Sequence, residues 1–273
     1  SRLSRKACLP ATLSLENPVS VSRTEYKFLI DEDQYRQFRD EIATKLEVYQ
    51  NPGNSGDYPI VSQYYDTPDR ECYWEKQRRF QSRRKIRVRI YGSEKAQIPP
   101  AGFLEVKHKL CGLGVKRRLQ LPVEVAQRFA QGDLEVLRDM YGEVSRSGRI
   151  VIDEVTGMIE QGGHQPSMQI RYDRNAFSSP DETLRITFDN ELLCRSDIRP
   201  LLPDDPGFRD HIIPSGQAIM EVKSIGPVPY WFRQRAGETG LMRRSFSKYC
   251  TSLEKYDPVL RAQIHGEAAA DAA

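Results

Sequence analysis

The chain has 273 residues, with 41 lysines and arginines against 38 aspartates and glutamates, which gives a formal net charge of +3. A hydrophobic content of 38% is sufficient for a packed core, so we expect a folded domain. The near balance of charges disfavours a nonspecific nucleic-acid binder, in which cations are in large excess. We therefore expect no nucleic-acid partner and only a local cationic surface.

Five cysteines are widely spaced, odd in number and free of paired C-x-x-C spacing, which favours a reducing compartment and disfavours a structural zinc site. No run approaches the roughly 18 apolar residues that a membrane-spanning helix needs. Residues 1–21 are predicted to be a disordered leader rather than a signal peptide, because their apolar part is short and interrupted by proline. Residues 263–273 are predicted to be a tail, which leaves one domain over residues 22–262.

The first predicted element is a strand over residues 23–30, followed by an amphipathic helix with Asp31 as its N-cap. Further strands are predicted at residues 60–65, 80–91, 103–110, 115–121, 168–177, 184–194 and 218–224. Helices are predicted at residues 70–76, in an outer helical insertion over residues 123–162, and from Trp231 onward. Residues 247–256 are predicted to form a loop that leads into a terminal helix.

Roughly eight strands joined by short turns or single helices predict antiparallel pairing, because parallel pairs need long crossovers. Eight such strands can close into a barrel whose bore suits side chains or one small ligand. The predicted fold class is therefore α+β, an antiparallel β-barrel with surrounding helices.

Charged or polar residues occupy every second position of several predicted strands. Examples are Arg87–Ile90 (RVRI), Glu105–His108 (EVKH), Arg185–Asp189 (RITFD) and Glu221–Lys223 (EVK). Alternation with period two is typical of a strand with two unlike faces. Because the polar faces repeatedly carry Arg, Lys and Glu, we infer that they form one lining. If helices cover the apolar faces, this lining would enclose a tunnel suited to phosphate chains and a metal ion.

Nine basic residues fall on these polar faces: Lys27, Arg87, Arg89, Lys107, Lys116, Arg118, Arg174, Arg185 and Lys223. Nine cations in one cavity would repel one another strongly, so the cavity should be open to water or hold an anion. Arginine grips phosphate oxygens in pairs, whereas lysine supplies a point charge, and a mixture of both suits successive phosphates.

Four carboxylates share the same faces: Glu25, Glu105, Asp189 and Glu221. They could hold Mn²⁺ or Mg²⁺, which takes oxygen ligands from carboxylates, phosphates and water. Catalysis would then consist of positioning and of neutralising charge on a transferred phosphoryl group, with little need for a side-chain nucleophile.

A simpler interpretation stays open for each strand taken alone, because a charged strand face is commonly a solvated surface with cross-strand ion pairs. Glu105 with Lys107, and Glu221 with Lys223, could be such pairs. The excess of basic over acidic residues across the whole set favours the lining. Ser247–Lys248 could be a helix cap and a surface cation, or a phosphate contact. The glycines at 112 and 114 predict a turn, and no Walker sequence is present.

Taken in order, these residues resemble the vacuolar transporter chaperone domain, a branch of the triphosphate tunnel metalloenzymes. The matching segments are Arg23–Lys27, Tyr64–Thr67, Lys85–Arg89, Phe103–Lys107, Val115–Arg118, Tyr172–Phe177, Leu184–Asp189, Met220–Lys223 and Phe246–Tyr249. The resemblance covers residues 22 to about 258. It implies an antiparallel tunnel barrel that transfers the terminal phosphate of ATP to a growing inorganic polyphosphate chain with Mn²⁺ or Mg²⁺.

The resemblance also implies roles for particular residues. Lys27, Arg87, Arg89, Lys107, Arg185 and Glu221 would be catalytic; Lys116, Arg118, Tyr172, Arg174, Lys223, Ser247 and Lys248 would bind phosphate or substrate; Glu221, Glu105 and Asp189 would hold the metal ion. The chain departs from the wider superfamily in its first strand, where Arg23 replaces the first acid of Glu-x-Glu-x-Lys. This weakens metal binding from that strand and resembles the polymerase branch more than the hydrolase branch.

The sequence contains neither the phosphate sensor domain nor the membrane helices of eukaryotic members. The resemblance therefore indicates a stand-alone bacterial domain in the cytoplasm, which would need a separate membrane partner to translocate its product. Two alternatives stay open: a tripolyphosphatase or nucleoside triphosphatase that uses the same tunnel, and a noncatalytic polyphosphate-binding module. The sequence does not indicate the oligomeric state.

Overall fold

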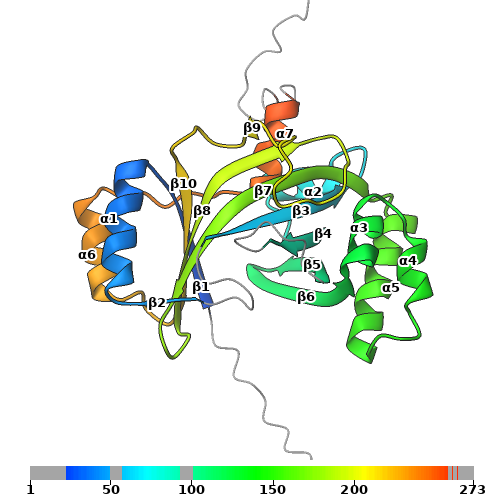
Figure 1. Cartoon of the computed structure of the whole chain (residues 1–273), viewed down its shortest axis with the longest axis horizontal. Coiled ribbons are helices and arrows are strands. Elements are labelled where there is room, and N and C mark those ends of the chain that lie inside the picture. Colours follow the sequence, from blue (N-terminus) through cyan, green and yellow to red (C-terminus); the bar gives the residue numbers. More distant parts are fainter. Residues whose placement is uncertain (1–22, 50–56, 93–100, 258–259, 261–262, 264–273) are drawn as a thin grey trace, which may run out of the picture.

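An antiparallel sheet forms the frame of the molecule (Figure 1). The computed structural model describes residues 23–49, 57–92, 101–257, 260 and 263, so the predicted leader and most of the predicted tail lie outside the described residues. The strands follow one another in the order β1 (Arg23–Ile30), β10 (Ala218–Ile225), β8 (Leu184–Arg195), β7 (Gln165–Ser178), β3 (Tyr58–Asp66), β4 (Ser82–Tyr91), β5 (Ala101–Leu110) and β6 (Leu113–Pro122). Two short strands extend the sheet, since β2 (Glu47–Val48) pairs with β7 and β9 (Asp210–His211) pairs with β8.

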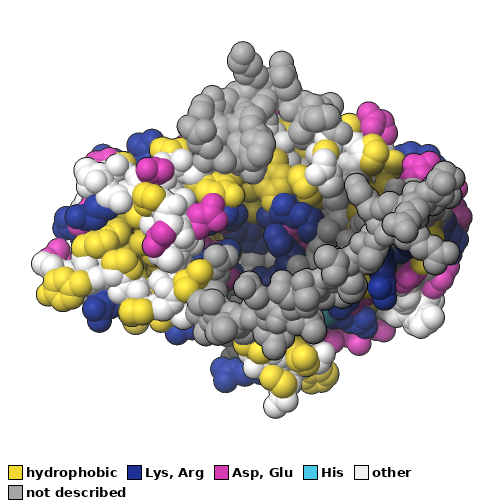
Figure 2. All heavy atoms as spheres, turned by 90° about the horizontal axis from the view of Figure 1, so that it is seen from below, with side chains coloured by type: hydrophobic (Ala, Val, Ile, Leu, Met, Phe, Trp, Pro, Cys, Tyr) yellow, Lys and Arg dark blue, Asp and Glu magenta, His cyan; other side chains and the backbone are white. Residues whose placement is uncertain are grey.

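The sheet is strongly curled, and one of its faces is hollowed (Figures 1 and 2). Its edge strands β1 and β6 do not pair with each other in the described part of the chain, so the sheet is a half-barrel. The predicted α+β class with eight antiparallel strands is confirmed. We call the hollowed face, which carries Lys27 and Arg87, the inner face.

The described residues form seven helices around the sheet. They are α1 (Glu32–Ala43), α2 (Glu71–Gln77), α3 (Val123–Ala130), α4 (Glu135–Asp139), α5 (Arg146–Glu160), α6 (Tyr230–Glu238) and α7 (Lys248–Tyr256). Helix α1 begins after the predicted N-cap Asp31, whose carboxylate accepts a hydrogen bond from the Gln34 backbone while the Gln34 side chain accepts one from the Asp31 backbone. None of these helices combines the length and apolar character needed to cross a bilayer.

The loop predicted over residues 247–256 is wrong, because those residues form helix α7. Ser247 is its N-cap, and its Oγ accepts a hydrogen bond from the Cys250 backbone at 3.4 Å. Tyr249, Cys250 and Leu253 are buried on one side of the helix. Their spacing of one, three and four residues is the helical signal that was present in the sequence.

Two apolar cores lie on the outer face of the sheet. Helices α1 and α6 cover β1, β10 and β8, where Phe38 and Phe188 belong to one core. Helices α3, α4 and α5 cover β3 to β6, where Phe129, Val88 and Leu104 belong to the other. Complete burial of each such side chain contributes about 1.5–3 kcal/mol to folding. Because the outer face supplies these cores, the inner face is left for polar residues.

A third core covers one end of the inner face. Helices α2 and α7 pack there, with Tyr73 and Leu253 in contact with a cluster that includes Ile60, Ile170 and Tyr172. This packing places the first turn of α7 against the charged residues of the sheet.

Candidate active site

Strand alternation gathers the predicted basic residues on the inner face. The sheet register pairs Lys27 with Glu221, Arg87 with Glu105, and Lys107 with Lys116. Residues directly opposite each other on antiparallel strands share a face. By this register and alternation, the inner face carries all nine predicted cations, namely Lys27, Arg87, Arg89, Lys107, Lys116, Arg118, Arg174, Arg185 and Lys223. Figure 2 shows basic side chains gathered in the hollow.

Glu105 is the centre of a charge cluster on the arm formed by β4, β5 and β6. It is fully buried, and its Oε2 accepts a hydrogen bond from Arg87 Nε at 2.6 Å. Its Oε1 accepts one from Arg118 Nε at 2.8 Å and lies 3.3 Å from Lys116 Nζ. Burial alone would raise the pKa of Glu105, but Arg87, Arg89 and the other two cations hold it well below its usual range. The ionised carboxylate therefore orients the two arginines.

Arg89 is buried and makes no direct ion pair with a carboxylate among the described residues, although Glu105 is close enough to act on it electrostatically. Its Nε donates to Ser62 Oγ at 3.1 Å, and its guanidinium carbon lies 5.8 Å from the ring centre of Tyr91 and 5.9 Å from that of Tyr172. A buried charge that no counter-ion contacts directly is costly. The position is therefore suited to receive an anion.

Tyr64 and Tyr91 join the site, although the sequence analysis did not select them. Arg87 Nη1 donates to Tyr64 OH at 3.3 Å, and Arg118 Nη2 donates to Tyr91 OH at 2.8 Å. Burial would raise the pKa of each phenol, but the nearby arginines lower it to about 8 for Tyr64 and to about 8 for Tyr91. The available signal was their position on the same strand faces as Ser62 and Arg89.

Asp189 organises a second cluster, on β7, β8 and α7. It is fully buried, and Arg174 donates to its two oxygens at 2.6 and 2.8 Å while Lys248 Nζ lies 2.5 Å from Oδ2. Burial would raise the pKa of Asp189, but Arg174 and Lys248 lower it to about 2. The ring of Tyr172 lies 5.3 Å from the guanidinium of Arg174 and 4.5 Å from Lys248 Nζ. The structure thus brings together three of the predicted substrate contacts.

Helix α7 is held in place by a buried hydrogen bond. Tyr249 OH donates to Asp66 Oδ2 at 2.6 Å, and the Tyr249 ring stacks on Tyr64 with ring centres 5.4 Å apart. Asp66 Oδ1 also accepts hydrogen bonds from the backbone N–H groups of Thr67 and Cys72, each at 2.8 Å. These contacts fix the start of α7 and thereby the direction of Lys248.

A third cluster lies on β1 and β10. Lys27 Nζ is 3.0 Å from Glu25 Oε1 and 3.8 Å from Glu221 Oε2, while Lys223 Nζ is 2.5 Å from Glu221 Oε1. Burial would raise the pKa of Glu221, but Lys223 and Lys27 hold it well below its usual range. Glu221 and Lys223 therefore form the ion pair that the sequence left open, whereas the contacts of Glu105 are with other cations than Lys107.

Arg185 on β8 lies directly opposite Lys223 on β10. Its guanidinium carbon lies 3.7 Å from the ring centre of Tyr49, at the end of the inner face away from α7. Arg185 is therefore the predicted cation whose closest described contact is an aromatic ring.

Lys107 links the two arms of the half-barrel electrostatically. Burial and then the charge of Lys27 lower the pKa of Lys107 to about 8, while Glu25 acts in the opposite direction. Lys27 and Glu25 belong to edge strand β1, on the other side of the hollow. Charges on β1 therefore influence the protonation of a lysine on β5, across the hollow.

The described residues contain no group of three His, Cys, Asp or Glu side chains placed to hold a metal ion. Glu105 and Asp189 are surrounded by cations, and these contacts do not favour their metal roles, which stay predictions. Glu25 and Glu221 fit a divalent cation better, because both carboxylates lie within 4 Å of the same nitrogen, Lys27 Nζ, and therefore lie close to each other. Mg²⁺ typically binds one or two carboxylates and completes its shell with phosphate oxygens and water.

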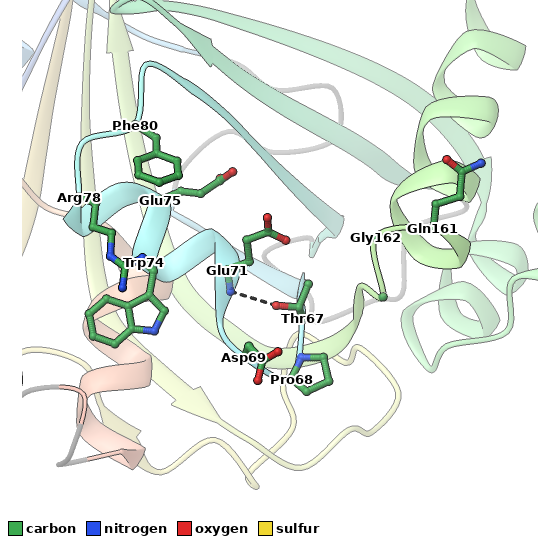
Figure 3. Close-up of a pocket in the computed structure, with 11 residues that line it drawn as sticks. Thr67, Pro68, Asp69, Glu71, Trp74, Glu75, Arg78, Phe80, Gln161 and Gly162 are labelled. Carbon is green, nitrogen blue, oxygen red and sulfur yellow. Dashed lines mark hydrogen bonds between the residues drawn. The ribbon is translucent and has the colours of Figure 1, made fainter.

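A separate pocket of about 590 Å³ lies outside the inner face, between α2 and the end of α5 (Figure 3). Three of its lining residues are the acids Asp69, Glu71 and Glu75. Burial, and then the neighbouring Glu71, raise the pKa of Glu75. Acidic walls repel phosphate, so the inner face and not this pocket has the charge that a phosphate chain requires.

The profile of the VTC domain family matches residues 22–256. The chain belongs to the VTC domain family. The resemblance drawn from the sequence is thereby confirmed for this VTC domain. The solved structure of HpAC1 from Hippeastrum, a protein reported to have a dominant triphosphatase activity, matches with a TM-score of 0.53 and 14% identity over 84% of this VTC domain and 93% of HpAC1. That likeness supports the triphosphate tunnel fold. A search of curated proteins finds no match.

Proposed function

We propose that this VTC domain is an ATP-dependent polyphosphate polymerase, which transfers the γ-phosphate of ATP to a growing inorganic polyphosphate chain. The observation that carries the proposal is the inner face itself, where basic residues from seven strands and α7 surround three ionised carboxylate clusters. Membership of the VTC domain family supports the substrate class.

In the proposed reaction, a terminal oxygen of the polyphosphate attacks the γ-phosphorus of ATP. A new P–O bond forms, the bond from the γ-phosphorus to the β–γ bridging oxygen breaks, and ADP leaves with the electron pair. Such transfers depend mainly on positioning and on neutralising charge. Arg87, Arg89 and Arg174 are held by Glu105, Ser62 and Asp189, which suits them to bind phosphate oxygens without reorganising.

Glu221, together with Glu25, would hold Mn²⁺ or Mg²⁺. The ion would supply charge neutralisation on the phosphate oxygens when bound. Lys27 and Lys223, which neutralise Glu221 in this structure, would then be free to contact phosphate.

A triphosphatase is the second candidate function, because the fold neighbour HpAC1 is reported to have a dominant triphosphatase activity. Water would replace the polyphosphate oxygen as the attacking group. A noncatalytic polyphosphate-binding module would bind with an affinity that falls as salt rises, and it would turn nothing over.

The test is to incubate the purified protein with ATP, Mn²⁺ and a short polyphosphate primer, and to size the products on a gel. Chains longer than the primer support the polymerase. Orthophosphate as the only product supports the triphosphatase, and tight binding without turnover supports the binding module.

Two variants test the site. Arg87→Ala and Glu221→Ala should each lower the rate of chain synthesis by about 100-fold or more, because Arg87 would supply positive charge at the phosphates and Glu221 would hold the metal ion. The matched control is Arg117→Ala. Arg117 lies on β6 of the same arm, but its side chain is on the outer face, where it contacts Glu154 at 2.8 Å. Unaltered synthesis in a folded Arg87→Ala variant would remove Arg87 from the site.

A cytoplasmic location and a separate membrane partner for product export belong to the same proposal. Co-purification of the protein with membranes tests whether it has such a partner.

A further inference from the structure

The cations of the arm formed by β4, β5 and β6 continue beyond the lining toward the turn between β5 and β6. The register places Arg83 opposite Lys109, Lys85 opposite Lys107, and Lys107 opposite Lys116. Like charges directly opposite each other on antiparallel strands are destabilising. The arm therefore carries three like-charged cross-strand pairs in series.

The described residues do little to neutralise this series. The one acid in the described strands β4, β5 and β6 is Glu105, which contacts Arg87, Arg118 and Lys116 and so neutralises only the inner end of the series. Lys109 is exposed, and neither Lys107 nor Lys109 has an ion-pair partner in the described part of the chain. Arg83 Nη1 reaches only the Lys76 carbonyl oxygen, at 3.5 Å.

The outer face of the same strands differs. There Arg84, His108 and Arg117 all lie near one carboxylate, Glu154 on α5, at 3.5, 3.1 and 2.8 Å respectively. These outer-face cations are therefore neutralised within the protein. On the inner face, Arg83, Lys107 and Lys109 have no carboxylate contact in the described part of the chain and are left for an external anion.

We propose that Arg83 and Lys109, together with Lys107 and Lys116, form a track that binds linear inorganic polyphosphate beyond the site of transfer. The inference rests on the proposed function, and it adds two residues to the site. Two residues along a strand advance by roughly 6.6 Å, so the Arg83–Lys109 pair lies one step farther out than Lys107. A long phosphate chain can contact more successive steps at once than a triphosphate can, so the outer pair should matter mainly for the long chain.

The experiment compares two double variants in the full chain: Arg83→Gln with Lys109→Gln on the inner face, and Arg84→Gln with Arg117→Gln on the outer face. Both remove two positive charges from β4 to β6. The Kd for tripolyphosphate and the Kd for long-chain polyphosphate are measured at one fixed salt concentration. The inner double variant should weaken long-chain binding by roughly tenfold and leave tripolyphosphate binding within about twofold, because two charged contacts are lost. The outer double variant should change neither affinity by more than about twofold.

An unchanged long-chain affinity in the inner variant, or an equal loss in the outer variant, would overturn the track. An equal loss for both ligands would also overturn it, because the residues would then belong to the lining. Arg83 and Lys109 make no buried ion pair in the described part of the chain, so the inner variant should fold. Thermal unfolding verifies the fold of both variants. If the unaltered protein makes no polyphosphate from ATP while the inner variant alone loses long-chain affinity, the polymerase proposal fails and the track stands.

Discussion

Tyr64 and Tyr91 report the charge of the inner face. Their hydroxyl oxygens accept hydrogen bonds from Arg87 and Arg118, and neighbouring cations favour the phenolate over the phenol. Each pKa is therefore lowered to about 8 in the absence of an anion. A bound polyanion would cancel this field.

We expect two tyrosines to ionise near pH 8 in the free protein, and their pKa values to rise toward the ordinary value of about 10 when tripolyphosphate binds. The sign follows because phosphate charges near the arginines disfavour a second negative charge on the phenol. Ultraviolet absorbance of the phenolate against pH, with and without tripolyphosphate, measures both states.

The Tyr64→Phe and Tyr91→Phe variants assign the two ionisations, since each variant should lack one of the two phenol ionisations near pH 8. Tyr230, whose side chain is largely exposed, provides a control as Tyr230→Phe, which should leave both steps in place. Identical titration curves with and without tripolyphosphate would contradict the placement of the phosphates beside these arginines.

At the same scale, alternation along the strands predicted which side chains face inward but not their partners. Glu105 was a candidate partner of Lys107, two residues away on the same strand, yet it contacts Arg87 and Arg118 on the two flanking strands. Partner choice depends on the cross-strand register, which alternation within a single strand does not give.

Among the elements, helix α7 contributes both to stability and to the site. The Tyr249 hydroxyl donates a hydrogen bond to Asp66, and the preceding residue, Lys248, contacts Asp189 in the site. Tyr249→Phe should lower the free energy of unfolding by about 1–3 kcal/mol, since it leaves a buried carboxylate oxygen without its donor. The same variant should weaken tripolyphosphate binding by a few-fold, because Lys248 is no longer held toward Asp189. Urea denaturation and a binding titration measure the two effects.

Tyr256→Phe is the matched control. Tyr256 also belongs to α7, and its hydroxyl donates hydrogen bonds to the Cys194 carbonyl oxygen at 3.3 Å and to the Asp210 carboxylate. It lies at the opposite end of the helix from Lys248, so it should affect stability and leave tripolyphosphate affinity unchanged. If Tyr249→Phe binds tripolyphosphate as tightly as the unaltered chain, α7 does not position Lys248 for binding.

Long elements with clear periodicity were predictable, and short ones were not. The strand over residues 23–30 and the helix after Asp31 follow from alternation and capping. Strands β2 and β9 have two residues each, which is too short for any period to appear. They form because β7 and β8 offer free backbone groups to them, a tertiary cause.

For the whole molecule, short connections were enough to predict an antiparallel sheet, but strand order and closure were not predictable. Strand β3 lies between β4, which follows it closely in sequence, and β7, about a hundred residues later. The paired strands β1 and β10 lie still farther apart in the chain. The strand order is determined by the two outer cores, in which particular helices pack on particular strands.

The open hollow between the arms gives the last prediction, because Lys27 and Lys107 repel each other across it and a polyanion would attract both. Tripolyphosphate at 100 times its Kd should stabilise the folded chain by about 2.7 kcal/mol, because it binds the folded state alone. For a domain of this size the midpoint of thermal unfolding should then rise by roughly 5–10 °C. Calorimetry with tripolyphosphate, against sodium chloride at equal ionic strength, separates binding from screening, since salt would only weaken the repulsion. An equal rise in both solutions would mean that the arms respond to ionic strength and that no polyanion bridges them.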